Sequence, residues 1–224
     1  MLAATRHQVI LDTLETQGSV RTIDLAQQLD VADETIRRDL ERLEKDNLLQ
    51  RTHGGAIKTE HFVKDRSFEE RNIQRIHEKQ RIGIEAAKLV QKGDRVFIDA
   101  SSTALQMIPR LSQVELVLMS NSALVSRAIE GRDSIELIHT GGVFDRQTKS
   151  YTGPAAIATL RRFRIDKVFF SGNGIDEQRG ISEVNEAQAY IKEMILPRAG
   201  FTCFLADPSK LGVTSTYFFA RTEE

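Results

Sequence analysis

Small polar residues and glycines follow each of five short apolar runs in the second half of this sequence. These polar segments are residues 99–104, 120–122, 140–142, 171–176 and 207–210. If the apolar runs are parallel strands, the segments gather at the carboxyl edge of one sheet, where such sheets bind ligands. Hydroxyl groups and free backbone N–H groups at the starts of helices favour an anion, above all a phosphate.

Different residues of these segments have different expected roles. The hydroxyl-rich segments 101–103 and 120–122 are expected to share one phosphate, and Lys210 supplies a compact positive charge. Asp99, Asp176 and Asp207 are candidate acceptors for sugar hydroxyls. Each feature alone is commonly structural, since serine before a helix is usually an N-cap and paired glycines usually form a turn. Together, five polar segments at one edge favour a phosphorylated small molecule.

A second chemistry is indicated near the N-terminus, where arginines recur on one predicted helix. Thr35, Arg38 and Arg42 share a helix face, and Arg37 lies beside it. An arginine on such a helix can donate two hydrogen bonds to guanine or hold a DNA phosphate. The candidate DNA-contacting residues are Thr22, Thr35, Arg37, Arg38, Arg42, Arg51 and His53.

The elements expected around these arginines are three short helices and a hairpin. Apolar spacing predicts helices from about residue 5 to 17, from 22 to 29 with Thr22 as its cap, and from 33 to 45. Strands at 48–52 and 56–58 would flank a tight turn at 53–55. This order is typical of a winged helix-turn-helix, whose third helix enters the major groove.

The charge balance limits how such a domain binds DNA. The whole chain has a formal net charge of -1, and residues 1–57 hold seven basic residues against ten acidic ones. Affinity must therefore come from a local patch of Arg37, Arg38, Arg42, Lys45 and Arg51. We expect the carboxylates of this region to turn away from that patch.

The rest of the chain alternates strands with helices. Helices are predicted at 79–91, 103–111, 122–130, 154–163 and 185–198, and strands at 95–99, 114–119, 134–139, 167–171 and 201–206. This alternation predicts an α/β domain, with a parallel-rich sheet covered by helices on both faces. We expect a DNA-binding domain at 1–57, a linker with a helical segment docked by Phe62 and Phe68 at 58–77, and a ligand-binding domain at 78–224.

Length and composition agree with this division. The 224 residues suit two domains, and the single cysteine, Cys203, excludes a disulfide framework and a multi-cysteine zinc site. No stretch approaches the ~20 apolar residues of a membrane span, and no signal peptide is recognisable. We expect a cytoplasmic protein with no cofactor, no metal and no membrane partner.

Two motifs resemble the DNA-binding domain of the DeoR-type bacterial repressors. They are Thr35-Ile36-Arg37-Arg38-Asp39-Leu40 and Arg51-Thr52-His53-Gly54-Gly55-Ala56. The resemblance implies a regulator that binds double-stranded operator DNA, most simply a repressor of a carbohydrate catabolic operon. Because paired half-sites add affinity, we expect a homo-dimer or homo-tetramer.

The second half resembles the effector domain of the same family, which is similar in fold to ribose-5-phosphate isomerase and senses phosphorylated sugars. The resemblance implies phosphate binding by Ser101, Ser102, Thr103, Asn121, Ser122 and Lys210, and a pocket lined by Gly141, Gly142, Gly172 and Gly174. Members of that family usually continue through another strand. Either the sequence is truncated here or the last sheet element is missing.

Two alternatives remain open at this stage. An isomerase or acyl-CoA-linked transferase on the same fold would use Asp176, Glu183 or Glu186 as its base and Lys210 on the phosphate. The short C-terminus suggests the other alternative, a regulator that has lost its effector.

Overall fold

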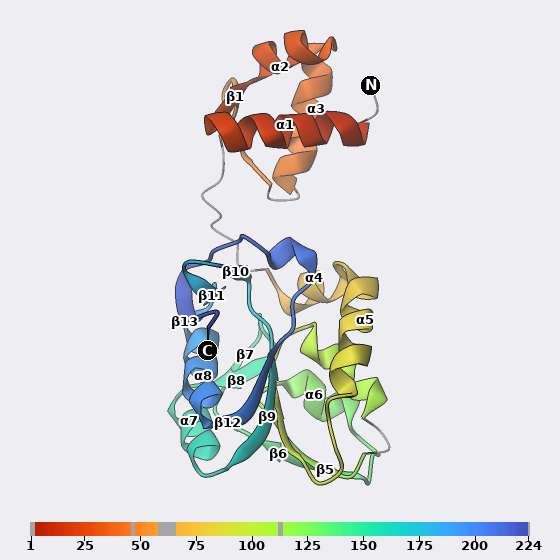
Figure 1. Ribbon diagram of the computed structural model, residues 1–224, viewed down its shortest axis with the longest axis vertical. Coiled ribbons are helices and arrows are strands. Elements are labelled where there is room, and N and C mark those ends of the chain that lie inside the picture. Colours follow the sequence, from red (N-terminus) through yellow and green to blue (C-terminus); the bar gives the residue numbers. More distant parts are fainter. Residues whose placement is uncertain (1–2, 46–47, 58–65, 112–113, 224) are drawn as a thin grey trace. The chain divides into compact units, whose positions relative to one another are not determined.

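The computed structural model describes residues 3–45, 48–57, 66–111 and 114–223. It divides the chain into two compact units, Met1–Phe62 and Val63–Glu224, which we call the first and second units (Figure 1).

The first unit is a three-helix fold with a small antiparallel sheet. Its helices are α1 (Ala3–Gln17), α2 (Thr22–Leu29) and α3 (Asp33–Lys45), and its strands are β1 (Ser19–Arg21), β2 (Gln50–Thr52) and β3 (Gly55–Ile57). The strands lie in the order β1-β3-β2. Ile10 and Leu14 of α1 pack with Ile36, Leu40 and Leu43 of α3, as their helical spacing predicts. Strand β1 is too short for a recognisable alternation and was not predicted.

The second unit is built on a five-stranded parallel sheet. Its strands are β4 (Arg95–Ile98), β5 (Leu116–Ser120), β6 (Ile135–His139), β9 (Ile165–Phe170) and β12 (Ala199–Phe204), in the order β12-β9-β4-β5-β6. The chain winds outward from β4 in one direction to β6, and then in the other through β9 to β12. The direction reverses between β4 and β9, so the crevice for a ligand is expected beyond their carboxyl ends.

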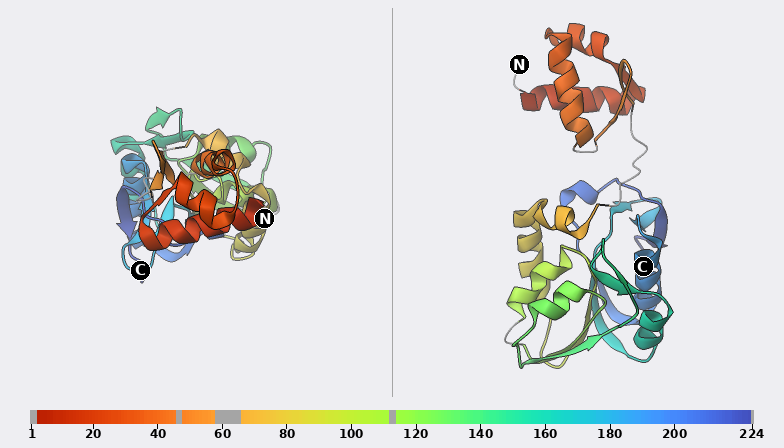
Figure 2. Two further views of the ribbon diagram at one scale, coloured as in Figure 1. Left: turned by 90° about the horizontal axis from the view of Figure 1, so that it is seen from above. Right: turned by 180° about the vertical axis from the view of Figure 1, so that it is seen from behind.

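Helices cover both faces of this sheet, which confirms the predicted fold class (Figures 1 and 2). On one face α5 (Ile76–Ala87), the 3₁₀ helix η1 (Ala104–Arg110) and α6 (Ala123–Ala128) pack against Val96 and Ile98. On the other face α7 (Pro154–Arg161) and α8 (Glu186–Ile195) pack in the cluster that includes Phe97. Successive residues of β4 thus enter opposite cores, as expected for a strand buried on both faces.

Several elements differ from their predicted form. The helix predicted at 103–111 is instead the 3₁₀ helix η1. It contains Pro109, which has no backbone N–H to donate to an α-helical hydrogen bond. The helix predicted at 79–91 begins three residues earlier and ends at Ala87, leaving Leu89 44% exposed rather than inward. The predicted linker does contain a helix, α4 (Phe68–Ile73), and Phe68 is buried there. Phe62 lies outside the described residues.

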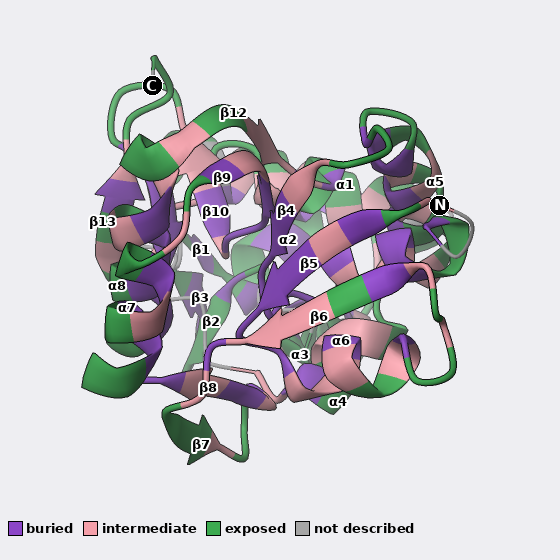
Figure 3. Cartoon of the chain, turned by 90° about the horizontal axis from the view of Figure 1, so that it is seen from below, coloured by how far each residue is buried: buried purple, intermediate pink, exposed green. Residues whose placement is uncertain are grey.

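Short antiparallel strands complete the second unit, and none of them was predicted. Strands β7 (Val143–Asp145) and β8 (Ser150–Thr152) form a hairpin whose β7 is largely exposed (Figure 3). Strands β10 (Gly174–Asp176), β11 (Gly180–Glu183) and β13 (Tyr217–Ala220) form a separate sheet in that order. The residues after 212 therefore do contain a further strand, β13, which pairs with β11.

Candidate functional site

Helix α3 turns its arginines to the surface of the first unit. Arg37 and Arg38 are 61% and 77% exposed, and Arg42 is exposed as well. The opposite face of α3 buries Ile36, Leu40 and Leu43 in the core, so the arginine face is free of internal packing. Thr35 is half-buried at the start of the helix. The geometry suits a helix that meets DNA with its outer face.

One expectation about this surface is wrong, because a carboxylate lies within the basic patch. Glu34 pairs with Arg38 at 3.3 Å and with Arg37 at 3.8 Å, and Glu41 pairs with Lys45 at 3.0 Å. These pairs follow the i, i+3 and i, i+4 spacing of a helix. They are solvent-exposed and weak, so DNA phosphates can compete with Glu34 for both arginines.

The buried carboxylate of α3, Asp39, has a structural role. It accepts hydrogen bonds from Arg6 Nε at 2.6 Å and Nη2 at 3.0 Å, and it lies 3.0 Å from His7 Nε2. Burial opposes ionisation of Asp39, but the hydrogen bonds from Arg6 and His7 outweigh it, and the pKa of this carboxyl is lowered. The contacts of Arg6 and His7 with Asp39 tie α1 to α3.

The hairpin after α3 presents Arg51 and His53 to solvent, as predicted. The Arg51 N–H donates to Glu44 Oε1 at 2.8 Å, which fixes the strand to α3. Thr22 does not have its predicted role: Arg21 holds the cap position of α2 without a side-chain bond, and Thr22 is buried. The Thr22 N–H donates to the Gly54 carbonyl at 2.9 Å, so this residue anchors the hairpin turn.

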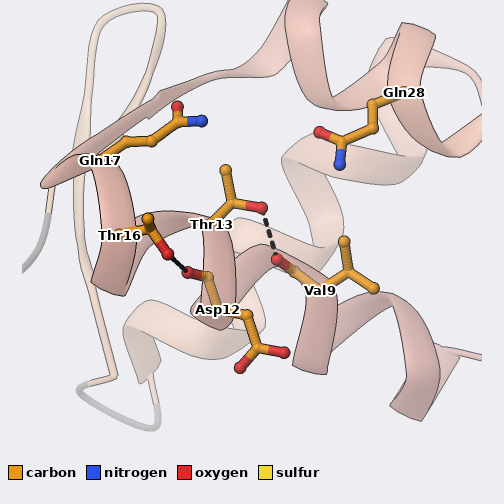
Figure 4. Close-up of a pocket in the computed structure, with 6 residues that line it drawn as sticks. All are labelled: Val9, Asp12, Thr13, Thr16, Gln17 and Gln28. Carbon is orange, nitrogen blue, oxygen red and sulfur yellow. Dashed lines mark hydrogen bonds between the residues drawn. The ribbon is translucent and has the colours of Figure 1, made fainter.

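A pocket of about 270 Å³ on α1 and α2 contains none of the predicted site residues (Figure 4). It is lined by Val9, Asp12, Thr13, Thr16, Gln17 and Gln28. The two threonine hydroxyls donate to carbonyls one turn earlier in α1, at 2.7 Å each. Its hydroxyl groups are thus engaged within the helix itself.

In the second unit, the predicted hydroxyl segments lie at the carboxyl ends of neighbouring strands β4 and β5. Ser101, Ser102, Thr103, Asn121 and Ser122 are all buried there. Ser101 Oγ accepts from the Ala104 N–H at 3.1 Å and Ser122 Oγ from the Val125 N–H at 3.3 Å. Ser122 thus caps α6 and Ser101 Oγ holds the start of η1, although each hydroxyl keeps a proton to donate.

Asp99 is a bridge between strands rather than an open acceptor. Its two carboxylate oxygens accept from the Ser101 and Ser171 N–H groups, each at 3.1 Å, which joins the ends of β4 and β9. The Lys192 ammonium lies 3.5 Å from the same carboxylate and also pairs with buried Glu183. These contacts occupy both oxygens of Asp99, contrary to its predicted role toward a sugar hydroxyl.

Four basic side chains collect beside Ser102, and we call them the basic cluster: Arg71, Arg75, Lys79 and Lys210. The Lys79 ammonium donates to Ser102 Oγ at 3.0 Å and to the carbonyl of Arg71. Lys210 donates to the Gly172 carbonyl, and Arg75 Nε lies 3.7 Å from Asp207. Arg71 Nε is buried with no hydrogen-bond partner among the described residues.

The electrostatics of the basic cluster reflect crowded positive charge. Burial lowers the pKa of Lys79 to about 8, and repulsion from Lys210, Arg71 and Arg75 adds to this, while Asp207 opposes it. Burial also lowers the pKa of Lys210. Burial disfavours ionisation of Asp207, but hydrogen bonds from Ser209 and the nearby lysines outweigh it and lower that pKa. Asp207 and Glu78 both lie near Arg75, at 3.7 and 3.8 Å, and Glu183 also acts on Lys210, so the four cations outnumber the carboxylates around them by a small margin.

Only Lys210 and Asp207 of this group were among the predicted residues. Arg71, Arg75 and Lys79 were missed because they fall in the predicted linker and at the start of the next helix. Their spacing of four residues was a usable signal, since it places side chains on one side of a helix. In the structure α4 ends at Ile73 and α5 begins at Ile76, so the three residues do not share one helix; Arg75, with a φ of 50°, is the N-cap of α5.

Two other buried polar atoms at this edge have no hydrogen-bond partner in the described part of the chain. They are Asn121 Oδ1, an acceptor, and His139 Nε2. His139 Nδ1 accepts from the Gly141 N–H at 3.1 Å, so Nε2 carries the proton of a neutral ring. Burial lowers the pKa of His139, which favours that neutral form. Asn121 directly follows β5, and His139 is the last residue of the neighbouring strand β6. Both residues contact Tyr151.

The predicted glycines serve close backbone approaches. A Cβ at Gly174 would lie 2.1 Å from the Val213 carbonyl oxygen, and one at Gly172 would lie 2.9 Å from that of Ser182. Gly142 has a φ of 114°, and a Cβ there would lie 2.3 Å from the Thr152 oxygen, whereas Gly141 has open space. Gly142, Gly172 and Gly174 thus hold the loops in place by admitting neighbouring backbone.

One oxygen of Asp176 has a structural role, and its role toward a sugar hydroxyl stays a prediction. Asp176 ends β10, and its Oδ1 accepts from the N–H groups of Gln178 and Arg179 at 3.0 and 2.8 Å, which shapes the turn into β11. The other bases considered for an isomerase are also separated: Glu183 pairs with Lys192, and Glu186 is exposed in the first turn of α8. Of the three candidate bases, Glu183 is thus engaged by a lysine and Asp176 by two backbone N–H groups.

These observations define a class of protein. An exposed arginine helix beside a hairpin, in one chain with an α/β unit whose sheet edge is basic and rich in hydroxyls, is the organisation of a ligand-responsive DNA-binding regulator. The chain belongs to the DeoR family of transcriptional regulators. The family profile described as "DeoR C terminal sensor domain" matches residues 74–224, and "DeoR-like helix-turn-helix domain" matches residues 6–61.

Curated relatives support this assignment along the whole chain. It is 39% identical over 212 residues to the uncharacterized HTH-type transcriptional regulator YulB of Bacillus subtilis, covering 95% of this chain and 82% of that protein. It is 33% identical over 224 residues to the transcriptional repressor GlcR of B. subtilis, covering 100% and 86%. The L-fucose operon activator of Escherichia coli is 33% identical over 211 residues, covering 93% and 87%.

Among solved structures, the chain is similar to ribose 5-phosphate isomerase A from Methanocaldococcus jannaschii. The TM-score is 0.45 at 17% identity, and the match covers 61% of this chain and 54% of the isomerase. In the described ranges, no helix is long and apolar enough to cross a membrane. No group of three His, Cys, Asp or Glu side chains suited to a metal ion occurs there either.

Proposed function

We propose that this protein represses a carbohydrate catabolic operon and that a phosphorylated sugar modulates its affinity for operator DNA. The observation that carries the proposal is the basic cluster beside Ser102. Lys79 is buried and Arg71 and Lys210 are half-buried, so their charges are costly without counter-charges. A phosphate offers charge-assisted hydrogen bonds to several such donors at once. The relatives named above include a repressor and an operon activator, which supports regulation of sugar genes.

The phosphate is assigned to the space between Lys79, Lys210 and the Ser101–Ser102–Thr103 loop. The sugar then extends toward Asn121, whose Oδ1 is buried and unpartnered in the described structure. A sugar hydroxyl can donate to this oxygen. The glycine loops at 141–142 and 172–174 complete the pocket. Residues 1–57 read the DNA, residues 78–224 hold the effector, and the segment 58–77 also contributes Arg71 and Arg75.

A dimer or tetramer in the cytoplasm is the working form under this proposal. One recognition helix reads few base pairs, and two half-sites held by one oligomer raise affinity through effective concentration. The effector must bind one arrangement of the DNA-binding parts better than another, because only differential affinity shifts an equilibrium.

The test is a gel-shift assay on DNA upstream of the neighbouring genes, with and without a panel of sugar phosphates. We expect specific binding and a change of about tenfold in Kd with one compound, within the usual range of allosteric coupling. The same compound should raise the melting temperature. Binding with no response to any compound would favour the effector-free regulator. Turnover of ribose 5-phosphate or fructose 6-phosphate, abolished by Asp176→Asn, would favour the isomerase.

The role of α3 is tested with Arg38→Ala. If Arg38 meets a base edge, the variant should lose about 1–3 kcal/mol of binding to operator DNA and discriminate less well among sequences. Lys88→Met, at an exposed lysine of the second unit, is the control. An equal loss on operator and random DNA would assign Arg38 to phosphate instead.

A further inference from the structure

Helix α4 is attached to the effector site by a small set of contacts that meet at Lys79. The Lys79 ammonium donates to two acceptors: the carbonyl of Arg71, which belongs to α4, and Ser102 Oγ, which belongs to the loop after β4. Ser102 Oγ also lies 3.4 Å from the same carbonyl. One buried ammonium thus joins α4 to the predicted phosphate loop.

Other contacts also hold α4, among them the buried Phe68 side chain and a 3.4 Å hydrogen bond from Gln106 Nε2 to Asn72 Oδ1. Its first N–H, of Phe68, donates to the Gln147 carbonyl at 2.8 Å, and Glu69 pairs with Lys149 at 3.1 Å. The capping box of Ser67 and Glu70 stabilises its first turn internally. With six residues, α4 is too short to be stable alone, so its position depends on these contacts and on Lys79.

The Arg71 side chain places an unsatisfied donor at this point. Its Nε is buried and has no hydrogen-bond partner in the described chain, and its guanidinium carbon lies 5.7 Å from the Phe68 ring centre. A buried N–H of a charged group without an acceptor is costly. Lys79, Lys210 and Arg75 add positive charge nearby, only part of which Asp207 and Glu78 offset, so an anion at this point would be stabilised.

We propose that an anion bound at the Ser101–Ser102–Thr103 loop bridges Lys79 and the Arg71 guanidinium, and so clamps α4 onto the second unit. This inference rests on the proposed function and identifies how that site is regulated. The anion accepts from Arg71 Nε and from Lys79, neutralises the mutual repulsion of the basic cluster, and makes the position of α4 depend on occupancy. Helix α4 is the first described helix after the first unit in the sequence. Anion binding at the loop would therefore change the part of the second unit that follows the DNA-binding unit in the chain.

The direct test is amide hydrogen exchange of the peptide containing residues 68–73 in the full-length protein. The probe is inorganic phosphate at millimolar concentration, compared with chloride at equal ionic strength. We expect phosphate to slow exchange in this peptide by about tenfold, as expected for a gain of one strong charge-assisted contact. Unchanged or faster exchange would overturn the clamp.

Lys79→Met tests the same point by substitution, since methionine fills similar space without the ammonium. Lys88→Met is the matched control, because Lys88 caps the same helix α5 but is exposed and pairs only with Glu85 among the described residues. We expect phosphate to protect residues 68–73 in the control as in the wild type, and to have less than about a twofold effect in Lys79→Met. Equal protection in both variants would overturn the proposal.

The DNA assay separates this inference from the proposed function. If sugar phosphates shift the operator affinity of wild type and Lys79→Met equally, the regulator stands and the clamp is wrong. If no sugar phosphate shifts the affinity of the wild type, yet phosphate protects α4 only when Lys79 is present, the clamp stands and the proposed function is wrong.

Discussion

At the scale of the residue, burial and neighbouring cations make the charged form of Lys79 less stable, whereas a bound anion would stabilise it. Its surroundings are Ser102, the Arg71 carbonyl, Asp207 and the cations of the basic cluster. A lowered pKa means that the folded protein releases this proton more easily than the unfolded chain. Its contribution therefore makes the free energy of unfolding rise with pH between about 8 and 10.5.

The pH dependence of anion binding should show this lysine. A phosphate group binds the charged form of Lys79, so its affinity should fall as the pH rises through about 8. Between pH 7 and pH 9 we expect a loss of about tenfold, measured by calorimetry with the sugar phosphate that the gel-shift panel selects. Lys79→Met should bind more weakly at pH 7 and lose most of this dependence. Equal affinities of the wild type at both pH values would contradict the assignment.

Asp39 gives a second residue-scale prediction, for stability rather than binding. Asp39→Asn removes the charge that Arg6 and His7 share, and we expect the first unit to lose about 1–3 kcal/mol of unfolding free energy. Since the pKa of Asp39 is lowered, the wild-type contribution is present above the ordinary carboxyl pKa and is lost as the pH falls below it. Glu41→Gln, at an exposed pair, is the control in urea unfolding and should show no measurable change.

At the scale of the element, α5 positions Lys79 through close packing on η1. Gly83 is the contact point, because a Cβ there would lie 2.6 Å from the carbonyl carbon of Gln106. A glycine within a helix costs helix stability, so its presence here indicates that the approach of the two backbones decides the residue. Sequence reasoning placed a helix at this position without indicating what its glycine does.

Gly83→Ala should therefore destabilise the second unit despite the better helix propensity of alanine. Propensity alone would add about 1 kcal/mol of stability, whereas overpacking costs about 1–3 kcal/mol and displaces α5 from η1. We expect a lower melting temperature and weaker phosphate binding, since Lys79 moves with the helix. Arg81→Ala on the exposed side of α5 is the control. A rise in melting temperature for Gly83→Ala would show instead that the η1 backbone moves away from the new methyl group at little cost.

At the scale of the whole molecule, net charge is a poor guide to DNA binding. The chain is close to neutral, and the exposed arginines of α3 share their surface with Glu34. What matters is the number of phosphates that each DNA-binding unit contacts, because each contact releases counterions. Five basic residues form the patch, and three of them, Arg37, Arg38 and Lys45, are paired with a carboxylate before DNA binds.

The salt dependence of DNA affinity should consequently be shallow. We expect a slope of log Kobs against log salt no steeper than about −5 for each DNA-binding unit. Fluorescence anisotropy over a series of salt concentrations measures it, with the oligomeric state determined under the same conditions. A slope near −10 per unit would mean that basic residues outside this patch also contact phosphate.

The sequence by itself determined the local elements and the face that each presents. Periodic apolar residues define α3 and its arginine side, and alternation of strands with helices defines the parallel sheet, because these patterns depend on neighbours within a few residues. The three-residue strands β1, β7 and β10 do not show such a pattern and were not predicted. Because parallel strands have their carboxyl ends at one edge, the same pattern also predicted that the polar segments lie at that edge of the sheet.

Only the tertiary structure decided which polar residues are free to act. Asp176 and Asp99 look alike as ligand acceptors in the sequence, but backbone N–H groups bond one oxygen of Asp176 and both oxygens of Asp99. Arg71 and Lys79 look like ordinary surface residues of a connector, yet they meet Ser102 and Lys210, which are distant in sequence. Hydrogen bonding and burial depend on the order of strands in the sheet and on the packing of α4 and α5. Those contacts join distant segments and leave no periodic trace in the sequence.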